Sequence, residues 1–374
     1  MKPKILFHLR ERSMKRSISV SLVVMCVFYT YGCADSPETE PGDVYQREGL
    51  TERGLGGMNL LGWFVPESWL NSLFYQHPAR DILSLYEQGL VENIEQHLDT
   101  FVVEQDLRGL ATEGFQLVRV SLGYWDIVGE THAAPHLDRI AQLLDWAAAA
   151  RLQVLLDLHA VPGSQNGYEH SGRVGPIRWY EPENLRRTLE ALAILAQHFG
   201  QHPALWGIQP VNEPNVVDVQ ILMDFYQRAY ATLRAFSDCW ITFSDGYVQL
   251  HQDSIWFDFF KLRASRWRKV ALDVHLYLAF YPHMDEEQMM HLTAEWSDVI
   301  DRYQQVVPVV IGEWSGGLPL DSRDKHTLTK KFIRRQQEIF AKTLAHFYAT
   351  YKGDYDVGIW DYSRHKNLIQ PAVL

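Results

Sequence analysis

Residues 137–159, LDRIAQLLDWAAAARLQVLLDLH, contain a helical pattern that leads directly into a strand pattern. Leu137, Ile140 and Leu144 recur at intervals of three and four residues, which places them on one face of a helix. Residues 153–159 then form a short apolar run that ends in a polar residue. A helix followed by a buried strand is the repeating unit of an α/β fold.

The same unit recurs along the chain from residue 53 onward. A second helical stripe passes through Leu192, Leu195 and Phe199, and Gly200 is expected to end that helix. Eight short apolar runs are candidate strands: 57–64, 117–122, 153–159, 205–211, 240–244, 270–276, 307–312 and 357–360. This alternation predicts a single (β/α)8 TIM barrel over residues 49–374, with the active site at the carboxyl ends of its strands.

The composition is that of a globular, acidic protein. The 374 residues are 47% hydrophobic and 22% charged, which supplies enough apolar side chains for a large core. The formal net charge is −11, whereas a protein that binds nucleic acid needs a basic surface for the phosphates. We therefore expect no nucleic-acid partner. The aromatic residues, 13% of the chain, could stack on sugar rings.

The first 32 residues have the pattern of an export signal. The basic residues of the segment 14–16 precede an uncharged stretch, 18–31, that is too short to span a bilayer comfortably. Gly32-Cys33 resembles the cleavage site of bacterial lipoproteins, where Cys33 would be lipidated. We predict a lipoprotein-type signal over 1–32. A conventionally cleaved signal and a retained anchor are the alternatives.

The segment that follows, residues 33–48, is rich in Pro, Asp and Glu and predicts a flexible tether. The expected location is the periplasm or outer membrane of a bacterium, or alternatively the exterior as a secreted protein. The lipid anchor would be the sole membrane contact, and we expect a monomer. Cys26 would leave with the signal and Cys33 would be lipidated, so Cys239 has no expected disulfide partner.

Two carboxylates occur where candidate strands 4 and 7 end. Glu213 lies in the motif VNEP (211–214), and Glu313 lies in GEWSG (312–316). Either motif alone is weakly specific. Because the carboxyl ends of all barrel strands open on one face, the two glutamates are expected to face one cavity.

Together with these glutamates, several longer motifs resemble glycoside hydrolase family 5, and within it the exo-β-1,3-glucanase branch. The resemblance runs from Arg53 to Trp360 and depends on four further motifs: GMNLLGW (57–63), VRVSLGYW (118–125), DLHAVPGSQNG (157–167) and DVHLY (273–277). It implies a retaining β-glycosidase that needs no cofactor and no metal.

The resemblance also implies a role for each matching residue. Glu213 would be the acid/base and Glu313 the nucleophile of a double displacement through a glycosyl-enzyme. Arg119 would keep the nucleophile ionised, and Asn212 would bind the 2-hydroxyl of the attacked sugar. The remaining matches are His159 and His275, which would position substrate or acid/base, Tyr277, which would lie near the nucleophile, and Trp360, which would form the floor of the sugar site from the end of strand 8.

Two glycines that are usual in the family are replaced by larger residues in this sequence. Leu61 and Ala160 stand where family members have glycine, so their side chains are expected to intrude at the site and affect linkage preference. Other aromatic residues could line further sugar sites or simply pack in the core: Trp63, Trp125, Tyr168, Trp256, Phe280 and Trp314.

The expected function is hydrolysis of β-glucosidic linkages in a glucan oligosaccharide or polysaccharide, in the manner of an exo-β-1,3-glucanase or β-glucosidase. An endo-β-glucanase of the same family is the first alternative. A non-catalytic glycan-binding surface lipoprotein is the second. The pairs Asp157/His159 and Asp273/His275, each two residues apart, make a metal-dependent hydrolase the third.

Overall fold

The computed structural model describes residues 52–75, 77–215, 217–246, 254–281, 284–319 and 325–371. The predicted signal (1–32), the tether (33–48) and Cys33 lie outside these residues. Among the described residues, no helix has the length and apolar character needed to cross a membrane.

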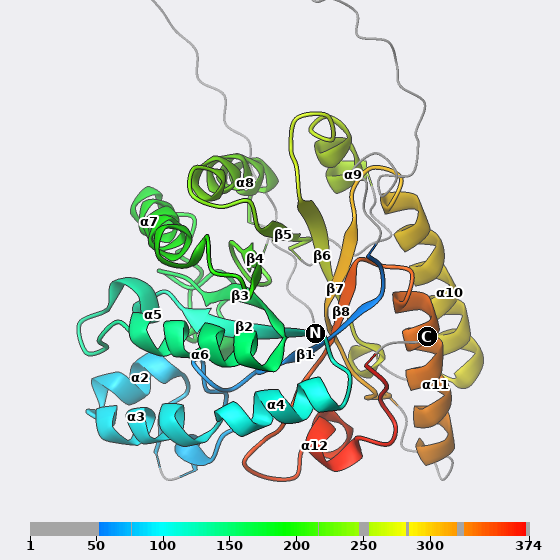
Figure 1. Ribbon diagram of the computed structural model, residues 1–374, viewed down its shortest axis with the longest axis horizontal. Helices are drawn as coiled ribbons and strands as arrows, with labels where there is room; N and C mark the ends of the chain where they lie inside the picture. Colours follow the sequence, from blue (N-terminus) through cyan, green and yellow to red (C-terminus); the bar gives the residue numbers. More distant parts are fainter. Residues whose placement is uncertain are drawn as a thin grey trace, which may run out of the picture. The chain divides into compact units, whose positions relative to one another are not determined.

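Eight parallel strands form a closed barrel in sequential order, which confirms the predicted fold. Figure 1 shows these strands at the centre with the larger helices packed outside them. The strands are β1 (Leu55–Asn59), β2 (Leu117–Gly123), β3 (Gln153–Ala160), β4 (Leu205–Gln209), β5 (Trp240–Ser244), β6 (Val270–Leu276), β7 (Val309–Trp314) and β8 (Ala345–Tyr348).

The longer helices lie outside the barrel (Figure 1), and each has a buried apolar face. The α-helices of the described residues are α2 (Ile82–Glu87), α3 (Val91–Thr100), α4 (Glu104–Thr112), α5 (Trp125–Val128), α6 (Leu137–Ala150), α7 (Pro182–Phe199), α8 (Val219–Arg234), α9 (Ser254–Lys261), α10 (Glu286–Tyr303), α11 (Lys325–Phe340) and α12 (Tyr362–His365). Helix α7 ends before Gly200, as the sequence predicts. Within the part of the chain that the structure describes, four 3-10 turns lie in loops: η1 (Ser72–Phe74), η2 (Glu169–Ser171), η3 (Leu278–Phe280) and η4 (Gly358–Trp360).

Side chains from seven strands fill the barrel interior with one apolar layer. This cluster contains Leu117, Leu155, Trp206, Trp240, Ala271, Val310, Ala345 and Phe347, together with Leu344 just before β8. Because residues two apart share a face of a strand, the next inward positions carry Arg119, Asp157 and Asp273. A polar layer therefore lies directly above the apolar layer, toward the carboxyl ends of the strands.

The prediction for strand 8 is wrong. Residues 357–360 contain the 3-10 turn η4, and the eighth strand is β8, which pairs with β1 and β7. A run of four residues with one glycine carries no reliable periodicity, and Gly358 has a positive φ of 62° that a strand does not adopt. Trp360 thus lies in the loop after β8, where its carbonyl accepts a hydrogen bond from Thr350 N at 2.8 Å.

Other strand boundaries also differ from the prediction, and those of β1, β4 and β7 bear on the site. β1 ends at Asn59, β4 ends at Gln209, and β7 extends through Trp314. Glu313 is therefore part of β7 itself, whereas Glu213 lies in the loop after β4.

Candidate active site

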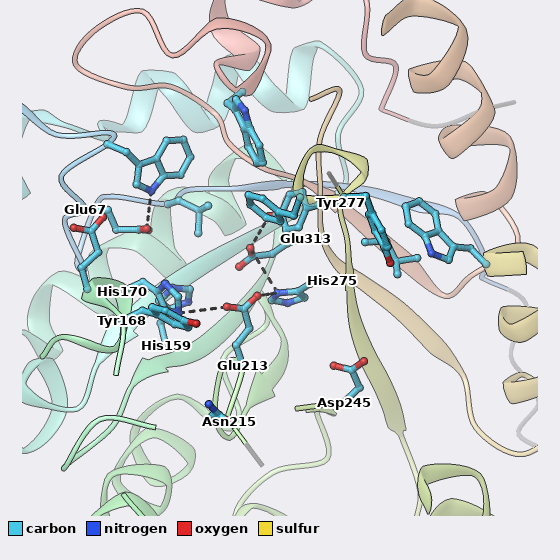
Figure 2. A pocket seen from close by; sticks show the side chains of 18 residues that line it. Glu67, His159, Tyr168, His170, Glu213, Asn215, Asp245, His275, Tyr277 and Glu313 are labelled. Carbon is cyan, nitrogen blue, oxygen red and sulfur yellow. Dashed lines mark hydrogen bonds and ion pairs between the residues drawn. The ribbon is translucent and has the colours of Figure 1, made fainter. Parts of the chain in front are cut away.

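A cavity of about 1220 Å³ opens at the carboxyl ends of the strands. Glu213, Glu313, His159, His275, Tyr277 and Trp360 all line it. Figure 2 shows Glu213 and Glu313 directed toward each other with His275 beside both. The structure thus brings together side chains that the sequence placed on separate segments.

Glu313 is 7% exposed and is held by two donors. Arg119 Nη1 donates to its Oε1 at 2.8 Å, and the Tyr277 hydroxyl donates to its Oε2 at 2.7 Å. Burial and the Glu313 carboxylate raise the pKa of Tyr277 well above its usual value, so Tyr277 remains a proton donor at neutral pH. Both contacts stabilise negative charge on Glu313.

A β-bulge directs Glu313 into the barrel. The pairing of β6 with β7 shifts between Val274 and His275, so that His275 pairs with Glu313. A bulge of this kind redirects the side chains that follow it. Gly312 lies at the shift, and a Cβ on it would lie 2.1 Å from Asp273 Oδ1, so only glycine fits there.

Arg119 is completely buried and holds the polar layer together. Besides Glu313, it donates to Asn59 Oδ1 at 2.9 Å, Gln209 Oε1 at 3.1 Å and Asn212 Oδ1 at 2.7 Å. Its Nη2 also lies 3.0 Å from Asp157 Oδ2. A planar guanidinium can satisfy so many acceptors at once because its donors point in fixed, divergent directions.

Glu213 has a strained backbone and a contact with His275. Its φ is +42°, in the left-handed region that residues other than glycine seldom occupy. Asn166 Nδ2 donates to the Glu213 carbonyl at 3.1 Å and helps to hold this conformation. The Glu213 carboxylate Oε1 lies 2.6 Å from His275 Nδ1.

His275 bridges the two glutamates. Its Nδ1 lies 3.6 Å from Glu313 Oε2, and its Nε2 lies 3.2 Å from Asp273 Oδ2. Burial opposes protonation of His275, but the carboxylates of Glu313, Asp273 and Glu213 together hold its pKa well above the usual value. His275 therefore donates hydrogen bonds to the carboxylates beside it.

His159 is buried on the other side of the cavity, and its Nδ1 lies 2.6 Å from Asp157 Oδ2. Each of the two Asp-x-His pairs thus forms an internal hydrogen bond. One ligand-type atom from each of Glu213, His275 and Glu313 lies within 4.8 Å of the others. The contacts of His275 Nδ1 with the carboxylates of Glu213 and Glu313 already explain why these three side chains lie so close together. We therefore assign none of the three as a metal ligand.

Several residues of the site were not predicted from the sequence. Asn59 and Gln209 complete the contacts of Arg119, and Glu67 and His170 line the cavity. Asn59 could have been found, because it lies in the strand 1 motif. Gln209, Glu67 and His170 carry no signal in a single sequence, since their place depends on how the loops fold.

The intrusion predicted for Ala160 is wrong, whereas that for Leu61 is confirmed. Leu61 lines the cavity, but Ala160 is fully buried and faces away from it, packed beside Gly172. Among the further aromatic residues, only the exposed Tyr168 and Phe280 line the cavity. Trp63, Trp125, Trp256 and Trp314 are buried in the core.

Comparison with known proteins agrees with this geometry. Residues 90–361 match the cellulase family, glycosyl hydrolase family 5. The chain is 31% identical over 278 residues to the probable glucan 1,3-beta-glucosidase A of Aspergillus niger, over 70% of this chain and 65% of that relative. Identity to the protein of the same name from Aspergillus terreus is 32% over 282 residues, with coverages of 70% and 65%. The chain thus spans just under two thirds of the length of these two relatives.

Among solved structures, rutinosidase from Aspergillus niger superposes with a TM-score of 0.70 at 18% identity, covering 85% of this chain and 97% of that one. This likeness concerns the fold. Taken with the family match over residues 90–361, the barrel and its paired glutamates establish that the chain belongs to glycosyl hydrolase family 5, as the motifs predicted.

Proposed function

We propose that this chain hydrolyses β-glucosidic linkages with retention of anomeric configuration, with Glu313 as nucleophile and Glu213 as acid/base. The observation that carries the proposal is the spacing of the two carboxylates, whose nearest oxygens lie within 4.8 Å. Retaining glycosidases keep their carboxyl groups about 5–5.5 Å apart, whereas inverting enzymes need a wider gap of about 6.5–9.5 Å for a water molecule.

The surroundings of the glutamates support this division of roles. A nucleophile must be ionised, and Glu313 contacts the Arg119 cation and the Tyr277 hydroxyl. Attack of a Glu313 oxygen on the anomeric carbon breaks the bond to the leaving oxygen, which takes a proton from Glu213. Water then attacks the same carbon, gives its proton to Glu213 and releases Glu313.

Asn212 is suited to bind the attacked sugar. Its Oδ1 accepts from Arg119 Nη2 at 2.7 Å, which fixes the amide orientation. Its Nδ2 is buried and has no hydrogen-bond partner among the described residues. A buried donor left unpaired is costly, so a sugar hydroxyl that accepts from it would be held firmly. The 2-hydroxyl is our candidate, because contacts to it strengthen in the transition state.

The proposed substrate is a β-1,3-linked glucan or oligosaccharide cut from its end. Two relatives, at 31% and 32% identity, are named probable glucan 1,3-beta-glucosidase A, which supports this choice. Mixed-linkage glucan, β-1,6-glucan and glucosylated lipids or steroids are competing substrates. Endo cleavage is the competing mode of action.

The test is digestion of a panel of defined β-gluco-oligosaccharides by the purified protein, followed over time by NMR. We expect glucose as the first product from a β-1,3-linked oligosaccharide, released as the β-anomer. Release of the α-anomer first would overturn the retaining mechanism. Internal cleavage products would replace exo by endo action.

Two further assays separate a retaining glycosidase from a glycan-binding protein and from a metal-dependent hydrolase. Turnover of an aryl β-glucoside distinguishes an enzyme from a non-catalytic glycan-binding protein, which would give none. Retention of full activity after treatment with a chelator distinguishes glutamate chemistry from metal-dependent hydrolysis.

We also propose that the chain is exported and anchored by a lipid on Cys33. The basis is the sequence pattern of residues 14–33, with a basic start, an uncharged stretch and Gly32-Cys33. An extracellular or periplasmic place suits an enzyme that acts on a polysaccharide too large to enter a cell.

A further inference from the structure

Two neighbouring side-chain amides of the loop after β3 hold two neighbouring carbonyl groups of the loop after β4. Gln165 Nε2 donates to the carbonyl of Asn212 at 3.0 Å. Asn166 Nδ2 donates to the carbonyl of Glu213 at 3.1 Å. The backbone carbonyl of Gln165 in turn accepts from Asn215 N at 3.0 Å. Three hydrogen bonds thus join the two loops at the proposed acid/base.

Both amides are buried, and further contacts fix their orientation. Gln165 Oε1 accepts from Val161 N at 3.3 Å, and its Nε2 also donates to the carbonyl of His159 in β3 at 2.6 Å. Asn166 Oδ1 accepts from Tyr168 N at 3.0 Å. Because each amide oxygen already accepts a hydrogen bond, neither amide can turn over without losing contacts at both of its ends.

The two carbonyls belong to the peptide groups on either side of the Glu213 α-carbon. Because a peptide group is planar, only the φ and ψ angles of Glu213 relate one of these planes to the other. The second peptide joins Glu213 to Pro214, which has no N–H, so the carbonyl is the sole polar group by which this plane can be held. Holding both planes therefore sets both angles, and with them the direction of the Glu213 side chain.

The backbone of Glu213 needs such support. Its φ of +42° lies in the left-handed region, from which a residue with a side chain tends to relax. Strand pairing does not reach it, since the last residue pair between β3 and β4 is Asp157 with Gln209. Figure 2 shows the Glu213 side chain pointing toward Glu313. Relaxation of φ to negative values would turn that side chain away.

We propose that Gln165 and Asn166 are the positioning residues of the acid/base, and that they direct the Glu213 carboxyl group into the cavity by fixing the peptide planes on either side of it. This inference rests on the proposed function. Glu313 is held instead by Arg119 and Tyr277. Loss of either amide should therefore impair proton transfer and leave attack by the nucleophile intact.

The test uses Gln165→Met and Asn166→Leu, which keep the approximate size of each side chain but have no amide donor. The substrates are phenyl and 2,4-dinitrophenyl β-glucoside, since the second has a leaving group that needs almost no acid. Gln337→Met is the matched control. Gln337 is a buried amide on α11, outside the cavity lining, and its Nε2 donates to the carbonyl of Gln370 at 2.6 Å.

On the phenyl glucoside, kcat/KM should fall about 10- to 100-fold in each variant, because a misplaced acid protonates the leaving oxygen poorly. On the dinitrophenyl glucoside, kcat/KM should change less than about threefold. The kcat and KM for this substrate should instead fall together by about tenfold, because attack of water on the glycosyl-enzyme still needs Glu213 as base. Gln337→Met should keep each of these constants within about twofold of the wild type.

Equal losses of kcat/KM on the two substrates would reduce the amides to a structural role and overturn the proposal, as would wild-type kinetics in both variants. Where a variant does not fold, alanine at the same position, which leaves a space that water can occupy, takes its place with the same expectations. A wild-type protein that cleaves neither glucoside would instead overturn the proposed function.

Discussion

Arg119 Nη1 donates to Glu313 Oε1 at 2.8 Å, although the two residues lie 194 positions apart in the chain. Both are buried, and Arg119 also compensates the buried carboxylate of Asp157. The ion pair therefore links the proposed nucleophile to the stability of the barrel.

Arg119→Ala should lower the free energy of unfolding by about 3–5 kcal/mol, because the buried carboxylates of Asp157 and Glu313 would lose their guanidinium partner. Urea denaturation at pH 7 measures this. Arg108→Ala, which breaks an exposed i,i+4 pair with Glu104 on α4, is the control and should cost less than about 1 kcal/mol. Similar small losses in both variants would contradict the prediction.

Azide rescue should distinguish the roles of the two glutamates. Glu213→Ala, given an activated aryl β-glucoside and azide, should form the β-glucosyl azide, because the anion enters from the face that the acid/base occupied. Glu313→Ala should abolish hydrolysis and form the α-azide, because the anion replaces the nucleophile. NMR of the products identifies the anomeric configuration of the azide formed by each variant. An α-azide from Glu213→Ala would reverse the assignment.

Trp360→Ala should lower kcat/KM by roughly 10- to 100-fold, since stacking and burial of a sugar on the ring supply about 1–3 kcal/mol. The ring lines the cavity beside Tyr277, at 5.2 Å between centroids, and Trp69, at 5.6 Å. Because it is only partly buried, the variant should fold.

Trp360→Phe is the matched control, and it should keep most of the activity because a smaller aromatic face remains. Thermal unfolding of all three proteins completes the experiment. An Ala variant that unfolds at room temperature with unchanged activity per folded molecule would make Trp360 a core residue.

Glu67 should make stability depend on pH. It is 6% exposed, and burial is the main cause that raises its pKa from 4.5 to about 7. The folded state therefore binds the carboxyl proton of Glu67 more tightly than the unfolded state does. The folded protein loses stability as pH rises from about 4.5 to about 7. The full penalty above that range is about 3 kcal/mol.

Glu67→Gln removes this penalty and can still accept the hydrogen bond from Trp69 Nε1. Its gain in unfolding free energy over the wild type should be about 3 kcal/mol larger at pH 8 than at pH 4, as measured by urea denaturation. Glu338→Gln, at an exposed position on α11, should differ from the wild type by a constant amount. A gain in unfolding free energy for Glu67→Gln that does not change with pH would contradict the raised pKa of Glu67 as its cause.

Cys33→Ser should prevent lipid attachment when the full chain is expressed in a bacterial host. We expect loss of labelled fatty acid and a shift of the protein from the detergent-soluble membrane fraction to the soluble fraction. Cys239→Ser, at a buried free cysteine in the barrel, is the control and should keep the label. Absence of label from the unmutated protein would favour a conventionally cleaved signal.

Much of the fold could be predicted because helical and strand periodicities are local. The stripe through Leu137, Ile140 and Leu144 became α6, and the apolar run that follows became β3. The last strand could not be predicted, because His346 and Tyr348 interrupt its apolar pattern within only four residues. Its identity depends on pairing with β1 and β7, which lie far away in the sequence.

The sequence by itself determined that Glu213 and Glu313 belong near the mouth of one barrel, because each follows or ends a strand in an alternating α/β pattern. Only the tertiary structure decided that Glu313 faces inward. Strict alternation from the interior residue Val310 would direct Gly312 inward and Glu313 outward. The bulge in β7 adds Gly312 as an extra residue and directs Glu313 inward as well, and Gly312 must lack a side chain because Asp273 occupies the space beside it. The direction of the Glu313 side chain is set by the register between strands and by close packing, and neither can be predicted from the local sequence pattern of one strand.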